Sequence, residues 1–239
     1  MKRDNESEAD AALDDARRLS DEGRFAEALE KHIWFHDHAL EVDEALYGVR
    51  LSYALADWVK LGSRYPPALQ ALIEVRDRNT AEITSGSRSY ELFHDVVAIN
   101  EALGRDDLNV ALFFDVERSD PAHARAIFDV VDDSLARSGE YETYSRYLDD
   151  PQARIRHLVE RRGFEDLDSF GEHRERIAAR AHRRFAQDVA LLVKILSSTG
   201  RGAEADAAVS QAVEAVGIEL RPTIEEELRK LDSEPGFDG

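Results

Sequence analysis

Histidines at helical spacing are the first residues in this sequence whose types could do chemistry. His32 and His36 lie four residues apart, so on a helix they would share one face and could bind one metal ion. His38 would point away from that face, because two residues turn a helix by roughly 200°. A third ligand would have to come from elsewhere, with His94 or Asp95 as candidates. The HExxH motif is absent and a bare pair is a weak signal, so we predict no metal site and interpret the rings as packing between helices.

Other signatures of catalysis are missing. Cysteine is absent, which excludes disulfides, thiolate metal sites and cysteine nucleophiles. The motifs GxxxxGK[ST] and GxSxG are absent, and no GxGxxG follows a strand-like stretch. The adjacent His94 and Asp95 diverge by about 100° on a helix, so they do not form an acid–base pair. Paired acidic residues such as Asp149 and Asp150 fall at expected helix ends, where capping explains them. The sequence therefore predicts no enzyme and no cofactor.

Arginines gather in one stretch of this acidic chain. The whole sequence has 31 Lys or Arg against 50 Asp or Glu, a net charge of −19, yet residues 154–184 hold nine Arg against six Asp or Glu. Four of these arginines fall on neighbouring helical turns and could bind phosphate or an acidic peptide: Arg176, Arg180, Arg183 and Arg184. The alternative is that this face balances the acidic N-terminal half within the molecule.

Composition and net charge narrow the partners and the location. A strongly acidic surface repels nucleic acid and anionic membranes and favours a protein or peptide with basic segments. No apolar run approaches the roughly 18 residues of a membrane span, and residues 1–10 lack an apolar signal core, so we expect a cytoplasmic protein. Hydrophobic residues make up 43% of the chain and long alternating Val/Ile/Thr runs are absent, which predicts a folded, all-α protein.

The stretch from Leu55 to Leu72 indicates how these helices are arranged. It follows the spacing W-x2-L-G-x2-Y at Trp58, Leu61, Gly62 and Tyr65. This spacing resembles that of the tetratricopeptide repeat, a pair of helices that stacks on its neighbours. Pro66 and Pro67 follow directly, and proline disfavours helix in the residue before it. We therefore place Tyr65 at the start of the second helix of its pair, as Phe25 is in the preceding pair.

The same opening recurs along the chain at irregular distances. A bulky residue followed three positions later by a small or aromatic one starts a second helix at Phe25/Ala28, Tyr65/Ala68, Leu108/Ala111 and Tyr141/Tyr144, with a weaker copy near Gly202. The successive spacings are 40, 43, 33 and 61 residues, whereas regular tetratricopeptide repeats recur at about 34. We therefore predict a right-handed, tetratricopeptide-like solenoid of helical hairpins rather than a regular array.

The expected organisation has four parts. Residues 1–8 are expected to be disordered, residues 9–151 to form the tetratricopeptide-like repeats, residues 152–232 to form a C-terminal helical extension packed on the same solenoid, and residues 233–239 to be a disordered tail. Within the repeats, one continuous helix is expected over residues 43–62. The Ser- and Gly-rich segment 84–89 is the clearest expected loop.

The resemblance also implies a function. In tetratricopeptide proteins the first helices line a concave groove that holds an extended peptide or a partner helix, and the candidates for such a groove are Trp34, Tyr47, Arg50, Tyr53 and His94. Aromatic residues at helical spacing are also typical of a core, and the sequence leaves both interpretations open.

The leading hypothesis is a non-enzymatic interaction or scaffold module that binds a protein or peptide partner on a concave helical surface. One alternative is a regulatory domain that binds a small ligand or metal near His32 and His36. Another is an acidic immunity- or inhibitor-like protein that binds a basic partner. Stacking of such units also leaves a homodimer open, although the sequence indicates no interface.

Overall fold

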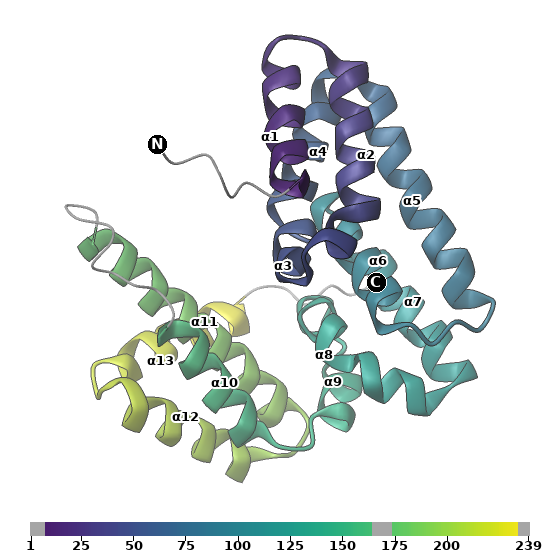
Figure 1. Cartoon of the computed structure of the whole chain (residues 1–239). Helices are drawn as coiled ribbons and strands as arrows, with labels where there is room; N and C mark the ends of the chain where they lie inside the picture. Colours follow the sequence, from purple (N-terminus) through teal and green to yellow (C-terminus); the bar gives the residue numbers. More distant parts are fainter. Residues whose placement is uncertain (1–7, 164–173, 234–239) are drawn as a thin grey trace. The chain divides into compact units, whose positions relative to one another are not determined.

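The computed structural model describes residues 8–163 and 174–233, and in these residues helices are the only regular secondary structure (Figure 1). The all-α class expected from the sequence is therefore confirmed. None of the described helices is long and apolar enough to cross a membrane. The disorder expected for residues 1–7 and 234–239 lies outside the described residues. Glu8, expected in the disordered start, is instead the first residue of a helix, and Ser233 is the last residue of another.

The chain divides into two compact units, Met1–Ser134 and Leu135–Gly239, which we call unit 1 and unit 2. The boundary between them falls inside helix α8 (Pro121–Arg137). The domain boundary expected after residue 151 stays a prediction.

Unit 1 is built from consecutive helices that pack on their neighbours in sequence. Their bounds are α1 Glu8–Asp21, α2 Phe25–Val42, the 3-10 turn η1 Glu44–Leu46, α3 Tyr47–Arg50, α4 Tyr53–Arg64, α5 Pro66–Thr84, α6 Tyr90–Ala102, α7 Asp106–Ser119 and α8. Helix α1 packs on α2, α4 on α5, and α6 on α7. Helix α2 also contacts α4, and α5 contacts α6, so each pair is joined to the next. Each helix therefore buries its apolar face against a neighbour rather than alone.

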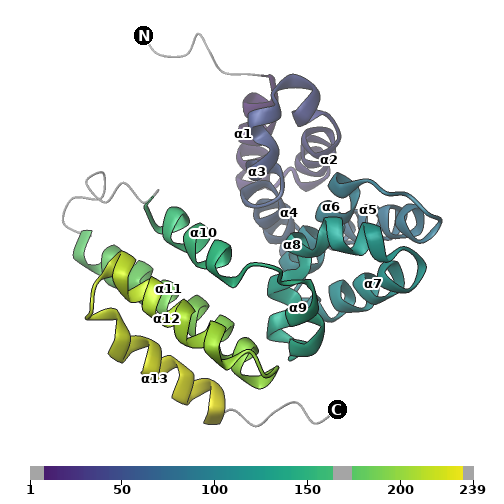
Figure 2. The ribbon, with the colours of Figure 1, turned by 90° about the horizontal axis from the view of Figure 1, so that it is seen from below.

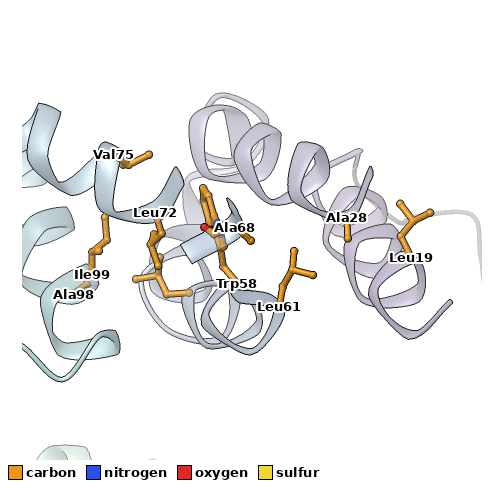
Figure 3. Packing of buried hydrophobic residues seen from close by; sticks show 10 residues of the cluster. Leu19, Ala28, Trp58, Leu61, Ala68, Leu72, Val75, Ala98 and Ile99 are labelled. Carbon is orange, nitrogen blue, oxygen red and sulfur yellow. Dashed lines mark hydrogen bonds between the residues drawn. The ribbon is translucent and has the colours of Figure 1, made fainter. Parts of the chain in front are cut away.

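Trp58 belongs to a cluster of buried residues in unit 1 that also contains Leu61, Ala68 and Leu72 (Figure 3). Its side chain is 1% exposed, and its indole Nε1 donates a hydrogen bond of 2.8 Å to the carbonyl oxygen of Ala68 on the partner helix. Gly62 allows this approach, because a Cβ at that position would lie 3.0 Å from the Cβ of Leu69. The Trp and Gly of the sequence motif thus fix how closely α4 and α5 pack.

Tyr65 occupies the position that the proline pair predicts. Helix α4 ends at Arg64 and α5 begins at Pro66, with Tyr65 between them in a non-helical conformation. The rings of Tyr65 and Phe25 lie 6.1 Å apart, each at the start of the second helix of its pair. The prediction that these two aromatic residues play equivalent roles is confirmed.

The continuous helix expected over residues 43–62 is wrong. The structure breaks this segment into η1, α3 and α4, with the last break at Leu51 and Ser52. The hydroxyl of Ser52 donates to the carbonyl of Gly48, and such side-chain bonds to the backbone compete with helix continuation. Arg50, directly before the break, is turned into the interior of the unit. Tyr47 and Arg50 on α3 therefore do not lie on one continuous helix with Trp58 on α4.

The expected loop over residues 84–89 is present between α5 and α6. Helix α5 ends at Thr84, and Ser89 caps α6 by accepting a hydrogen bond of 3.1 Å from the backbone N–H of Leu92. Gly86 has a φ of 109°, a conformation that side chains with a Cβ rarely adopt.

Buried amides fix how the later helices of unit 1 align. Asn100 on α6 donates a 2.8 Å hydrogen bond to the side chain of Asn109 on α7, and Asn109 donates at 3.2 Å to the hydroxyl of Ser134 on α8. All three side chains are buried. Because buried polar groups without partners are costly, these bonds hold three helices in one relative position.

Unit 2 is organised around one long helix (Figure 2). Its helices are α9 Tyr141–Tyr147, α10 Pro151–Gly163, α11 Arg174–Ser198, α12 Gly202–Val216 and α13 Leu220–Ser233, preceded by the end of α8. Helix α11 contacts α9, α10, α12 and α13. Its buried side carries Phe185, Val189 and Leu192, which supply the centre of the unit.

Candidate functional site

The most elaborate polar arrangement in the described part of unit 1 is a buried ion pair between α3 and α6. The guanidinium of Arg50 contacts both carboxylate oxygens of Asp95, with Nη2 at 2.7 Å from Oδ2 and Nη1 bound to Oδ1. Its Nε donates to the carbonyl oxygen of His36 at 2.6 Å, and its Nη2 lies 3.2 Å from Nε2 of the same histidine. Arg50 and Asp95 are both less than a tenth exposed. Every nitrogen of the Arg50 guanidinium therefore has a partner within the unit.

This geometry fixes the protonation state of His36. Since a guanidinium only donates, the nearby Nε2 must accept, which places the ring proton on Nδ1. Nδ1 is buried and has no hydrogen-bond partner. His32, one turn earlier, is also buried with an unpartnered Nδ1, and its ring stacks on Trp58 at 5.8 Å. Burial lowers the pKa of each histidine to about 4, so both are neutral at pH 7.

We expect unit 1 to lose stability as the pH falls from about 6.5 to about 4. In that window the unfolded chain binds protons at His32 and His36 that the folded chain excludes, so acid favours unfolding. At pH 4 the cost is about 3 kcal/mol for each histidine. Urea titrations followed by tryptophan fluorescence at several pH values between 4 and 7 measure the free energy of unfolding directly.

Substitutions show whether the loss of stability in acid comes from the two histidines or from carboxylates that bind protons over the same pH range. His32→Phe and His36→Phe keep a ring against Trp58 but cannot be protonated, so each should flatten the acid limb of the stability profile. His38→Phe, on the same helix at a half-exposed position, is the matched control. An acid limb of equal steepness in all three variants would contradict the assignment. The charged groups nearest the two rings are Arg17 and Asp57 for His32, and Asp37, Arg50, Arg78 and Asp95 for His36.

A second polar group lies beside this ion pair and is only partly buried. The hydroxyl of Tyr47 on α3 and Nδ1 of His94 on α6 share a hydrogen bond of 2.9 Å. Tyr90, one turn before His94, meets the same imidazole edge to face at 5.9 Å, and its hydroxyl donates to Asp129 on α8 at 3.0 Å. We call Tyr47, Tyr90, His94 and Asp129 the tyrosine–histidine cluster.

The rings of this cluster are uncharged at neutral pH. Burial lowers the pKa of His94 and raises the pKa of Tyr47 and of Tyr90; the bond to Asp129 raises the pKa of Tyr90 further. The exposed Asp129 carries the negative charge. Two aromatic faces, an imidazole and a carboxylate side by side can recognise a cationic side chain through cation–π and charge–charge attraction.

The residues predicted for the groove are separated by the fold. The structure brings Tyr47 and His94 together, and buries Arg50 behind them. Trp34 is partly buried and packs on His38 with ring centroids 5.4 Å apart, while Tyr53 is 71% exposed at the start of α4. Of the five candidates, Tyr47 and His94 are the two that belong to the tyrosine–histidine cluster.

The histidine pair considered for metal is placed in the core. His32 and His36 do share a helix face, and that face packs on Trp58. Across residues 8–163 and 174–233, no group of three or more His, Cys, Asp or Glu could hold a metal ion.

The arginines predicted to bind an anion do share a surface. Arg176, Arg180, Arg183 and Arg184 all lie on α11 and are all exposed. Their positions i, i+4, i+7 and i+8 place them on one face of the helix.

Tyr90 and Asp129 belong to the cluster but are not among the residues predicted from the sequence. Tyr90 and His94 are four residues apart, and that spacing on a helix could have indicated their contact. Asp129 lies 39 residues beyond Tyr90, and no local pattern links the two.

Comparison of the chain with protein-family models, with curated proteins and with solved structures finds no match in any of the three.

Proposed function

We propose that this chain is a non-enzymatic interaction module with a tetratricopeptide-like fold, and that unit 1 binds a basic segment of a partner protein at the tyrosine–histidine cluster. The partner contributes lysine or arginine side chains to the two tyrosine rings and to Asp129. Neither catalysis nor a resident cofactor is part of the proposal.

The packing order of unit 1 supports the class of fold. Helices α1 and α2, α4 and α5, and α6 and α7 are consecutive pairs. First helices also contact first helices, since α1 touches α4 and α4 touches α6, and the second helices α5 and α7 touch each other. Contacts of this kind are what stacked helical hairpins make. The aromatic residues Phe25 and Tyr65, at the beginnings of α2 and α5, are also consistent with a repeated helical hairpin.

The position of the cluster is the observation that carries the proposal. Its histidine and one tyrosine come from α6, the first helix of its pair, and Tyr47 directly precedes α4, another first helix. Its carboxylate comes from α8. First helices line the concave side of a tetratricopeptide array. Partly exposed tyrosines with a polar tip are typical of protein-binding surfaces.

The distribution of charge supports a basic partner. Residues 1–134 contain 15 Lys or Arg and 29 Asp or Glu, a net charge of −14, which is most of the charge of the chain. Arg50, whose charge acts on Tyr47 and His94, is paired with Asp95. A potential of this sign attracts basic segments and speeds their association at low salt.

Binding of a short peptide of alternating arginine and glycine tests the proposal. Fluorescence anisotropy with the full-length chain should show binding that weakens as salt rises. Tyr90→Ala and Asp129→Asn should each weaken it by roughly tenfold, because each removes a direct contact with the cation. Matched controls are Tyr53→Ala, an exposed tyrosine outside the cluster, and Asp21→Asn, an exposed carboxylate at the end of α1.

The controls decide whether the cluster or only the net charge is responsible. Equal weakening by Asp129→Asn and Asp21→Asn, together with no effect of Tyr90→Ala, would contradict the proposed site. A pull-down of the tagged chain at low and high salt, read by mass spectrometry, then identifies the natural basic partner. The inhibitor-like alternative predicts one stoichiometric basic protein whose own activity is lost on binding.

A further inference from the structure

A row of exposed arginines runs along the first half of α11 in unit 2. Arg176, Arg180 and Arg184 are exposed at successive turns, and Arg183 is exposed beside them. The opposite side of the helix is buried through Phe185 and the apolar residues that follow it. The arginine face is therefore held in place by the core of the unit, not by its own contacts.

These arginines differ from several others in the chain. Five exposed arginines form salt bridges with nearby carboxylates, namely Arg17, Arg18, Arg24, Arg105 and Arg118. Within the described residues, no carboxylate forms a salt bridge with the four arginines of α11. Arg183 lies near enough to Glu226 on α13 to help lower its pKa, although Lys230 is the main cause. Arg176, Arg180 and Arg184 form no salt bridge with the carboxylates that the structure describes.

A row of like charges of this kind destabilises α11 when no partner is bound. Like charges four residues apart destabilise a helix by about 0.2–0.5 kcal/mol per pair. Arg176 also lies in the first turn of α11, where the helix dipole favours negative rather than positive charge. Among the described residues, no salt bridge joins a carboxylate to this row, in a chain whose net charge is −19. An anion on a binding partner would offset this repulsion between the arginines.

The spacing of the charges indicates the form of the anion. Successive arginines are about 6 Å apart along the axis, and Arg176 and Arg184 are about 12 Å apart. One phosphate is too small to reach all three. Carboxylates on every fourth residue of a partner helix repeat at the same 6 Å distance. Ala179 beside the row is exposed and small, so a second helix can approach closely.

We infer that the arginine face of α11 binds an acidic helix of a partner protein, with carboxylates at i, i+4 and i+8 paired to Arg184, Arg180 and Arg176. Nucleic acid fits less well for two reasons. The net charge of the chain repels a long polyanion, and single strands are usually held by exposed aromatic side chains. The one aromatic residue on α11, Phe185, is buried. This surface is separate from the cluster proposed above.

The test is binding of an alanine-rich helical peptide with glutamate at every fourth position, measured with the full-length chain at low and moderate salt. The variant Arg176→Gln/Arg180→Gln/Arg184→Gln should bind it about tenfold more weakly or worse. The control variant Arg18→Gln/Arg24→Gln/Arg118→Gln has the same net charge but removes only paired arginines, so it should bind like the original chain. Circular dichroism checks that both variants keep their helices.

Three results would overturn the inference. Equal weakening in the two triple variants would mean that only net charge acts. Equal binding of a peptide with the same glutamates in one contiguous run would remove the argument from spacing. Tighter binding of an oligothymidylate, or a concentration-dependent dimer that the α11 variant abolishes, would assign the face to nucleic acid or to a second copy of the chain. Binding of the arginine–glycine peptide stays unchanged in the α11 variant, which separates this test from that of the tyrosine–histidine cluster.

Discussion

Replacing Asp95 with alanine is expected to destabilise unit 1 by about 3–5 kcal/mol, because the guanidinium of Arg50 would remain buried without its counter-ion. Only its bond to the carbonyl oxygen of His36 and its contact with the neutral ring would be left. Thermal and urea unfolding followed by circular dichroism measures the loss.

A double variant distinguishes the cost of an unpaired charge from the net contribution of the pair. Arg50→Leu/Asp95→Leu should recover most of the lost stability, since a buried ion pair contributes little compared with apolar side chains of similar volume. Asp115→Ala, which removes an exposed salt bridge to Arg118, should change the free energy of unfolding by less than about 1 kcal/mol. A double variant as unstable as Asp95→Ala alone would mean that the pair also specifies the packing of α3 on α6.

Trp58→Ala is expected to cost about 3–5 kcal/mol in unfolding free energy. The substitution leaves a cavity in the buried cluster around residue 58 and removes the hydrogen bond to the carbonyl of Ala68. It also removes the ring against which His32 and His36 pack. For a unit of this size the midpoint of thermal unfolding should fall by roughly 10–20 °C.

Two further variants show which property of Trp58 is responsible. Trp58→Phe keeps much of the apolar volume and should cost clearly less than Trp58→Ala. Trp34→Ala removes the other tryptophan of the chain, which is only partly buried, and should also cost less. Equal losses for Trp34→Ala and Trp58→Ala would show that Trp58 does not occupy a special place in the core.

The candidate site was only partly foreseeable from the sequence. The resemblance to the tetratricopeptide repeat makes His94 and Tyr47 candidates for the groove, and the structure joins them by a hydrogen bond. Arg50 was named for the same surface, yet it is buried. Its partner Asp95 is 45 residues away, and a break in the chain at Leu51 and Ser52 turns it inward. Contacts at such separations depend on how helices stack, which local spacing does not encode.

The sequence by itself determined the helical class, the positions of many helix ends and the importance of one motif. These follow from local physics: prolines at positions 66 and 67 end one helix and start the next, Ser89 caps α6, and the spacing of Trp58 and Gly62 matches two closely packed helices. The tertiary structure alone decided which charges are neutralised. It pairs Arg50 with Asp95 inside unit 1 and leaves Arg176, Arg180 and Arg184 exposed, because the burial and pairing of a charge depend on the neighbouring helices that fold against it.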